Sequence, residues 1–304
     1  MNKTATDLKI GVVGIPGKWS TEVLADEIEK RTGFRLVIDI EKVVADLSKP
    51  EVLYQDQCLC ELDGIIIKKI SQTYSPQVLD RLELLRFVEC CNVEVYSKPA
   101  EIIRLVDRMS CTVSLAKAKV PMPDTLITES MEAALDAVNK FGEVILKPLY
   151  STKARGMVVI SSQSNKSTIK QQLADFYQQH GFFYIQKKMK LPGHDMGLVF
   201  LAGEYKGAYA RVGNGNSWNT TIHSGGKYAK IEPDQAIIDM AYQAQSQFDL
   251  TYTTVDIAET EQGAVCFEVS AFGGFKGAQK ALGLNMAEQY AEYVIENLLK
   301  QNIS

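Results

Sequence analysis

The sequence predicts a mixed α/β protein, and three observations carry this prediction. Apolar strands alternate with amphipathic helices over residues 1–98, which favours a mainly parallel sheet. Two runs rich in β-branched and aromatic residues, 251–258 and 264–270, flank a short polar turn and predict an antiparallel hairpin. The length of 304 residues suits two or three domains. We expect three, over residues 1–98, 99–182 and 183–304.

The composition excludes several classes of protein. Hydrophobic residues make up 46% and charged residues 23% of the chain, and the net charge is −4, so we expect a globular protein without a nucleic-acid partner. No apolar run approaches the ~18 residues of a membrane span, and the N-terminus has no apolar signal segment. We therefore expect a cytoplasmic protein without a membrane partner. The six cysteines and three histidines lack zinc-ligand spacing and indicate reduced thiols.

The first elements form a strand–helix–strand unit. Strands are expected at 8–13 and 35–40, around a helix at 21–31 that Ser20 could cap. A glycine turn and a terminal acid loosely imitate a dinucleotide fingerprint. The glycines, however, read G-x-x-G-x-x-G, and Pro16 lies inside the turn. We interpret the unit as a plain βαβ motif, with a nicotinamide site as the distant alternative.

Lys147 ends the buried-type strand expected at 143–148, an unusual place for an ammonium group unless it meets an anion. The alternative is a lysine whose charge reaches solvent at the strand end.

The other expected elements, in chain order, are strand 63–68, helix 76–88, strand 93–96, a largely helical stretch 100–118, the proline-bracketed extended segment 120–125, helix 130–140, strand 143–148, strand 157–161, helix 168–179, strand 182–186, strands 196–202 and 207–211, helix 233–247 and helix 285–300.

The hairpin at 251–270 carries the first candidate site. If Glu259 pairs near Ala264 or Val265, Asp256 and Glu268 lie almost opposite each other, and Ser270 shares the face of Glu268. Two carboxylates so placed repel each other unless a cation lies between them, and oxygen ligands suit Mg²⁺. The alternative is an acidic pair on the solvated face of an ordinary hairpin.

Three loops are suited to anions. Residues 150–156 are polar and basic, with Lys153 and Arg155, and suit a mobile cover over phosphates. The turn 223–226 and the loop 271–277 are rich in glycine, so their backbone amides could approach an anion.

Taken together, the order of these elements resembles the ATP-grasp superfamily and, within it, the RimK-like carboxylate–amine ligases. The resemblance covers roughly residues 60 to 300 and implies an ATP-grasp fold preceded by a Rossmann-like pre-ATP-grasp domain. It rests on segments that follow one another as in that family: Asp107-Arg108, Val120-Pro-Met-Pro-Asp-Thr125, Ile145-Leu-Lys-Pro148, Gln186-Lys-Lys-Met189, Gly193-His-Asp195, Trp218 to Gly226 ending in His-x-Gly-Gly, Val255-Asp256 and Phe267-Glu-Val-Ser270.

The resemblance also implies roles for individual residues. Those that would bind nucleotide include cations for the phosphates, a hinge for adenine and an acid for the ribose. They are Arg108, Lys147, Lys153, Arg155, Gln186, Lys187, Lys188, Met189, Asp195, Asn219 and Thr221. Magnesium, with Mn²⁺ as the possible substitute, would bind Asp256, Glu268 and Ser270. Three residues would act in catalysis: Lys147 and Arg108 by holding the phosphates, and Arg211 by steadying the acyl phosphate. The alternative for Arg211 is a surface arginine.

Several positions depart from the family pattern. Arg108 stands where a lysine is usual, Gly197 where an arginine is usual, and Thr221 and Ser270 where asparagines are usual. A hydroxyl reaches less far than an amide oxygen, which puts the second of two expected metal ions in doubt. The segment 273–278 replaces the usual Ser-Pro-Gly and looks more like the branch that amidates cofactor precursors such as pterins or furans.

The implied activity has two steps. A carboxylate attacks the γ-phosphate of ATP to give an acyl phosphate and ADP, and an amine then displaces the phosphate to form an amide. We expect a small-molecule carboxylate and an amine such as glutamate as substrates, and a homo-oligomer, dimer or tetramer. The runner-up is a nucleotide-binding scaffold or regulator that has lost turnover.

Overall fold

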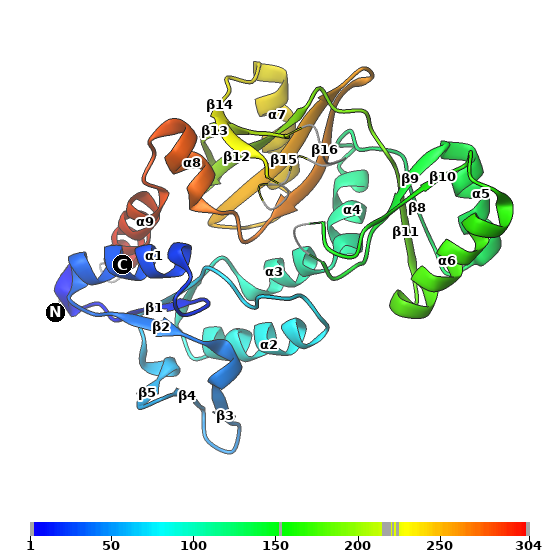
Figure 1. Ribbon diagram of the computed structural model, residues 1–304. Helices are drawn as coiled ribbons and strands as arrows, with labels where there is room; N and C mark the ends of the chain where they lie inside the picture. Colours follow the sequence, from blue (N-terminus) through cyan, green and yellow to red (C-terminus); the bar gives the residue numbers. More distant parts are fainter. Residues whose placement is uncertain (1–2, 152–153, 215–219, 221, 223–224, 302–304) are drawn as a thin grey trace.

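The structure is a computed structural model that describes residues 3–151, 154–214, 220, 222 and 225–301. Parallel and antiparallel sheets both occur, which confirms the mixed α/β class (Figure 1). Within the described residues, no helix is long and apolar enough to cross a membrane.

The N-terminal part is built on a parallel sheet, as predicted. Its strands are arranged in the order β2-β1-β6-β7, and helices α1 and α2 connect them. A small antiparallel sheet, β3-β4-β5, lies beside it and was not predicted. The bounds are β1 Ile10–Val13, α1 Trp19–Thr32, β2 Leu36–Ile38, β3 Val44–Asp46, β4 Glu51–Tyr54, β5 Gln57–Cys58, β6 Gly64–Ile67, α2 Gln77–Cys90 and β7 Glu94–Tyr96.

Helix α1 corrects one detail of the prediction. It begins at Trp19 after Lys18, so Ser20 lies inside its first turn rather than at its cap. A β-carbon at Gly14 would lie 2.4 Å from Cγ2 of Thr21. Helix–strand packing therefore requires this glycine.

Two helices, not one, link the N-terminal sheet to the rest of the chain. α3 (Pro99–Val106) and α4 (Arg108–Lys117) are separated by Asp107, whose backbone is extended at φ −93° and ψ 123°. The Asp107 carboxylate accepts a hydrogen bond from the backbone N–H of Met109 and caps α4. Arg108 is consequently fixed in the first turn of a new helix.

The central sheet is antiparallel in the order β10-β9-β11-β8, and helices α5 and α6 pack on it (Figure 1). One buried cluster includes apolar side chains of both helices and of these strands. The bounds are β8 Thr125–Thr128, α5 Met131–Phe141, β9 Glu143–Leu146, β10 Val158–Ser161, α6 Lys166–His180 and β11 Phe183–Lys187.

A five-stranded antiparallel sheet, β14-β13-β12-β15-β16, forms the C-terminal part. The predicted loop 271–277 is shorter than expected, because helix α8 begins at Phe275. The bounds are β12 His194–Leu201, β13 Glu204–Val212, β14 Lys227–Lys230, α7 Gln235–Gln245, β15 Tyr252–Thr260, β16 Gly263–Ser270, α8 Phe275–Leu282 and α9 Met286–Gln301. The division at residues 98 and 182 remains our proposal.

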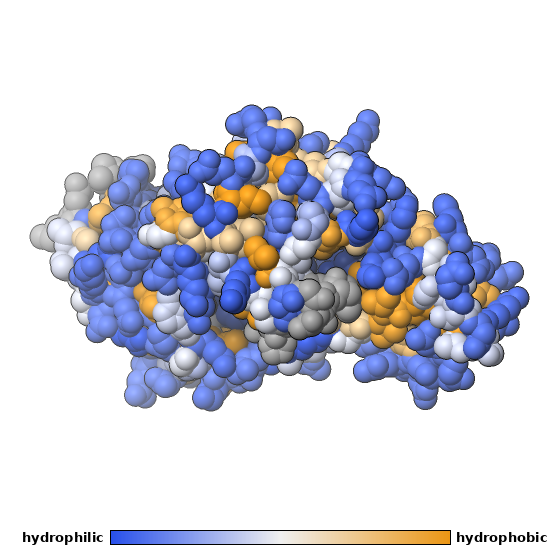
Figure 2. Space-filling model, turned by 45° about the horizontal axis from the view of Figure 1, so that its top comes forward, coloured by the Kyte–Doolittle hydropathy of each residue, from blue (hydrophilic) through white to orange (hydrophobic). Residues whose placement is uncertain are grey.

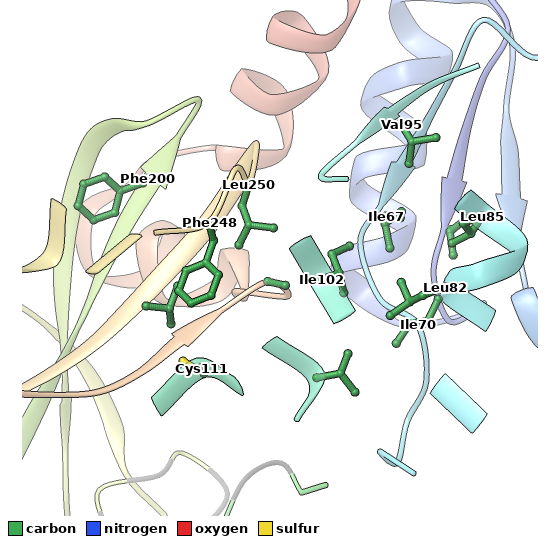
Figure 3. Packing of buried hydrophobic residues seen from close by; sticks show 14 of the residues in the cluster. Ile67, Ile70, Leu82, Leu85, Val95, Ile102, Cys111, Phe200, Phe248 and Leu250 are labelled. Atoms are coloured by element: carbon green, nitrogen blue, oxygen red, sulfur yellow. The ribbon is translucent and has the colours of Figure 1, made fainter. Parts of the chain in front are cut away.

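The N-terminal and C-terminal sheets share a hydrophobic core. In Figure 3, Ile102 of α3 lies between Ile67 of the N-terminal sheet and Phe248 and Leu250, which precede β15. All four side chains are at most 4% exposed. The face seen in Figure 2 is mostly hydrophilic, with apolar residues in smaller areas. The buried contact holds the N-terminal and C-terminal sheets together.

Candidate active site

The hairpin places its two carboxylates as predicted. Glu259 pairs with Ala264 and Asp256 with Glu268, and a register shift follows Asp256. Burial raises the pKa of Asp256 to about 6. Arg211 opposes this effect, whereas the neighbouring carboxylates Asp195 and Glu268 add to it. The pair is therefore a site of concentrated negative charge.

Arg211 bridges two strands of the C-terminal sheet. Its Nη2 lies 3.0 Å from Oδ2 of Asp256, and its Nε donates to Oδ1 of Asp195 at 3.1 Å. Burial alone would lower the pKa of Arg211, but the two carboxylates outweigh it and raise the pKa well above its usual value. Thr220 Oγ1 also donates to Asp195, at 2.6 Å. The expected ribose acid is thus bonded to Arg211 and Thr220 in this state.

Arg108 approaches Glu268 from helix α4. Its Nη1 lies 3.5 Å from Oε2 of Glu268, and its Nη2 donates to Ser151 Oγ at 3.4 Å. The side chain is 9% exposed. A small pocket lies here, lined by Arg108, Ser151 and Glu268 among others. Arg108 therefore joins the start of the predicted phosphate loop to the metal hairpin.

Lys147 follows strand β9 and is buried, with 7% of its surface exposed. Its ammonium donates to Oε1 of Gln186, whose Nε2 donates to Thr125 Oγ1 at 3.0 Å. Burial, with a smaller contribution from the nearby Arg108, lowers the pKa of Lys147 to about 7, although Glu268 opposes them. No carboxylate among the described residues is hydrogen-bonded to this buried ammonium, which is therefore suited to an anion that arrives from outside.

The other predicted nucleotide residues are less closely gathered. Lys187 lies 3.8 Å from Asp124, and Lys188 donates to Glu143 at 2.9 Å, so both lysines face acids of the central sheet. Arg155 is exposed and Met189 is half-buried. Lys153, Asn219 and Thr221 lie outside the described residues. Adenine recognition by this segment stays a prediction.

Gly197 has a steric explanation. A β-carbon there would lie 2.6 Å from Cζ of Tyr209 on the neighbouring strand. A β-carbon at Gly277 of α8 would approach the same ring from another element, at 2.4 Å. The Tyr209 ring thus fills the space beside Gly197 and leaves no room for the arginine usual at that position.

The donor set suits a hard cation. Asp256 and Glu268 supply carboxylate oxygens from paired positions, and Ser270, opposite Thr254, supplies a hydroxyl whose oxygen accepts from the backbone N–H of Phe272 at 3.3 Å. Among the described residues, no group of three or more His, Cys, Asp or Glu side chains is gathered for a metal. Asp256 and Glu268 therefore fit a magnesium ion whose other ligands come from bound phosphate or water.

Sequence reasoning missed several residues of this site. Thr125 and Thr220 bind Gln186 and Asp195, and Tyr209 packs against Gly197. Thr125 and Thr220 lie in segments that the sequence had marked, but no pattern specified their hydrogen bonds. Lys68, which lies outside this site, was missed as well. It carries the same sequence signal as Lys147, namely a lysine directly after a buried strand.

Comparison with known families agrees with the geometry. A family model described as the RimK-like ATP-grasp domain matches residues 106–294, well over half of the chain. The chain belongs to this family. It is an ATP-grasp ligase, an enzyme that joins a carboxylate to an amine.

Individual relatives extend the comparison to the whole chain. A protein of Methanosarcina acetivorans named tetrahydromethanopterin:alpha-L-glutamate ligase is 25% identical, over 96% of this chain and 99% of its own length. A protein of the same name from Methanocaldococcus jannaschii is 26% identical over 95% and 99%. A glutamate–LysW ligase of Sulfurisphaera tokodaii is 24% identical over 87% and 99%.

Solved structures confirm the fold. The ATP-grasp ligase PsnB, in complex with a variant of its minimal precursor, Mg and ADP, superposes with a TM-score of 0.73 at 16% identity, covering 98% of this chain and 99% of that one. A RimK domain ATP-grasp protein of Sphaerobacter thermophilus gives 0.72 at 16% identity, over 94% and 98%. The predicted ATP-grasp fold is therefore correct, and ATP with Mg²⁺ is the general requirement of such ligases.

Proposed function

We propose that this ligase adds L-glutamate, through its amine, to a carboxylate of a small cofactor precursor of the pterin type. The observation that carries the proposal is the full-length match to two tetrahydromethanopterin:alpha-L-glutamate ligases. The glycine-rich segment after the metal strand, where the usual Ser-Pro-Gly is replaced, supports the same branch.

We assign the phosphates of ATP to Lys147 and Arg108, with Lys153 and Arg155 closing from the loop between β9 and β10. Lys147 is buried with an ammonium that no carboxylate neutralises by a hydrogen bond among the described residues, and Arg108 links that loop to Glu268. The segment 186–189 would hold adenine. Asp195, Asn219 and Thr221 would complete the nucleotide site.

Magnesium is assigned to Asp256 and Glu268, with Ser270 as a weaker donor. When bound there, Mg²⁺ would neutralise the charge shared by the β- and γ-phosphates. The donor atoms would accept Mn²⁺ as well, since both ions take oxygen ligands.

The main requirement of the reaction is positive charge, because a carboxylate must approach ATP. Lys147 and Arg108 supply it from the phosphate side. Arg211 is bonded to both Asp195 and Asp256, and would exchange part of that bonding for the acyl phosphate. The loop over the phosphates would exclude water, which would otherwise hydrolyse the acyl phosphate.

A scaffold that has lost turnover remains the second candidate, and Ser270 and Gly197 favour it. Release of ADP and phosphate with Mg-ATP tests the two, using L-glutamate and a panel of reduced pterin-type, furan-type and peptide carboxylates, with mass spectrometry of each product. ADP formation that requires one acid and one amine supports the ligase and names its substrates. Tight ATP binding without turnover across the panel would favour the scaffold.

The number of subunits is a separate proposal. We propose a homo-oligomer, dimer or tetramer, and light scattering of the purified chain tests it. A monomer at assay concentration would contradict it.

A further inference from the structure

Lys68 is the second buried lysine of the structure that follows an apolar strand, and the proposed reaction does not use it. It comes directly after β6, at the carboxyl edge of the N-terminal parallel sheet, and is 3% exposed. Burial, with a smaller contribution from the neighbouring Lys69, lowers its pKa to about 7. Burying an ammonium group costs free energy unless other groups at that place bind it.

The side chain of Lys68 contacts the C-terminal part of the chain. Its ammonium donates to the backbone carbonyl of Gly273. It also lies 4.0 Å from the ring centroid of Phe275 and 5.1 Å from that of Tyr252. Two aromatic faces and one carbonyl therefore hold the cation. No carboxylate among the described residues is hydrogen-bonded to it.

Gly273 belongs to the loop 271–274, which joins the metal strand β16 to helix α8. A β-carbon at Gly273 would lie 2.4 Å from Cγ2 of Thr254, which pairs with Ser270 in the hairpin. A β-carbon at Gly274 would meet no atom within 4 Å, so that side of the loop faces open space. Because a peptide unit is planar and trans, a Gly273 carbonyl bonded to Lys68 directs the N–H of Gly274 away from Lys68.

The same N-terminal segment makes a second contact with this loop. Tyr74 meets Phe272 edge to face, with ring centroids 6.1 Å apart. Lys69 donates to the Tyr74 hydroxyl at 3.0 Å and lies 5.0 Å from the Phe272 ring centroid. Residues 68–74 thus contact the loop 271–274 at two successive points, next to Ser270.

We propose that Lys68 is a positioning residue that fixes the loop 271–274 for the carboxylate substrate by binding the Gly273 carbonyl. The loop follows the metal strand directly, so its place determines where the carboxylate meets the γ-phosphate. Lys68 acts through the loop and does not touch ATP. The inference rests on the proposed ligase reaction for its kinetic consequence, but its structural consequence does not depend on the substrate.

The test compares Lys68→Met with Lys98→Met. Methionine is apolar, adaptable and suited to aromatic neighbours, so it fills the space of Lys68 without donating to Gly273. Lys98 is the matched control, because it also bridges the N-terminal sheet to the C-terminal part, at 2.8 Å from Asp249, but with 52% of its side chain exposed. Hydrogen exchange of the peptide covering 271–277 is measured in both variants.

The expected result is exchange about tenfold faster at 271–277 in Lys68→Met alone, with the β1 and β6 amides unchanged. With tetrahydromethanopterin and L-glutamate as substrates, kcat/KM for the pterin should fall by about 10- to 100-fold, while the Kd for Mg-ADP and the KM for ATP stay constant. Exchange equal to that of wild type would overturn the proposal. So would faster exchange throughout the N-terminal sheet, which indicates only a structural role.

A second pair of variants tests the loop without Lys68. Gly273→Ala should reproduce the kinetic loss, because its methyl group collides with Thr254. Adding Thr254→Ala removes the atoms at 2.4 and 2.8 Å and leaves only Cβ at 3.1 Å, so the double variant should recover part of the loss. If no substrate supports turnover, the ligase proposal fails, and hydrogen exchange still decides the role of Lys68.

Discussion

Binding of ATP should draw a proton onto Lys147. Because burial lowers the pKa of this lysine to about 7, the ammonium is about 90% deprotonated at about pH 8 in the free protein. Phosphate oxygens favour the charged form and would move the pKa back toward 10.5. About 0.9 proton per bound nucleotide should be taken up at about pH 8, and about 0.1 at about pH 6.

Calorimetry measures this directly. Mg-ADP or a non-hydrolysable ATP analogue is titrated in buffers of different ionisation enthalpy, and the slope of the apparent enthalpy gives the number of protons. Lys147→Arg is the matched control, since arginine stays charged and should bind nucleotide without the uptake. Equal uptake in wild type and Lys147→Arg would refute the assignment of Lys147 to the phosphates.

The same shift fixes the sign of a stability effect. Between about pH 7 and 10.5 the unfolded chain holds a proton on Lys147 that the folded chain has lost. This lysine therefore makes the folded state more stable as pH rises through that window, by about 1.4 kcal/mol per pH unit at most. The difference between wild type and Lys147→Met in urea unfolding should change with pH in this direction.

Three further substitutions test the site. Glu268→Ala should lower turnover by at least about 100-fold, while the melting temperature stays near that of wild type because the side chain is 46% exposed. Glu261→Ala in the turn is the control, and an unaffected rate in Glu268→Ala would remove the hairpin from the mechanism. Gly197→Ala should destabilise the protein by about 1–3 kcal/mol in urea unfolding through its collision with Tyr209; unchanged stability would show that the ring moves freely. Arg211→Met should cost about 3–5 kcal/mol, because two carboxylates lose their cation; a loss below about 1 kcal/mol would contradict the buried network.

The sequence predicted the hairpin because a short polar turn separates two arms rich in β-branched and aromatic residues. From the observed pairing of Glu259 with Ala264, an unbroken ladder would put Asp256 opposite Phe267. The register shift after Asp256 puts Glu268 there instead, and no sequence pattern marked that shift. The strand before Lys147 was predictable from its apolar run. An ammonium directly after such a run is rare, which marked Lys147 as a candidate.

Other features depend on contacts that no local pattern encodes. The hydrogen bond from Arg211 to Asp195 joins the paired strands β13 and β12, and burial of the two side chains strengthens it. The break at Asp107 depends on a capping bond that a continuous helical pattern hides. Lys68 carried the same local signal as Lys147, but its partner Gly273 lies about two hundred residues further along the chain.

The central claim is an acyl-phosphate ligase, and transfer of oxygen from substrate to phosphate tests it most directly. The carboxylate that supports turnover is labelled with ¹⁸O, and the released phosphate is examined by mass spectrometry. The account predicts one labelled oxygen in the phosphate for each amide formed, because the carboxylate oxygen attacks the γ-phosphorus and leaves with it. Amide formation with unlabelled phosphate would contradict the account.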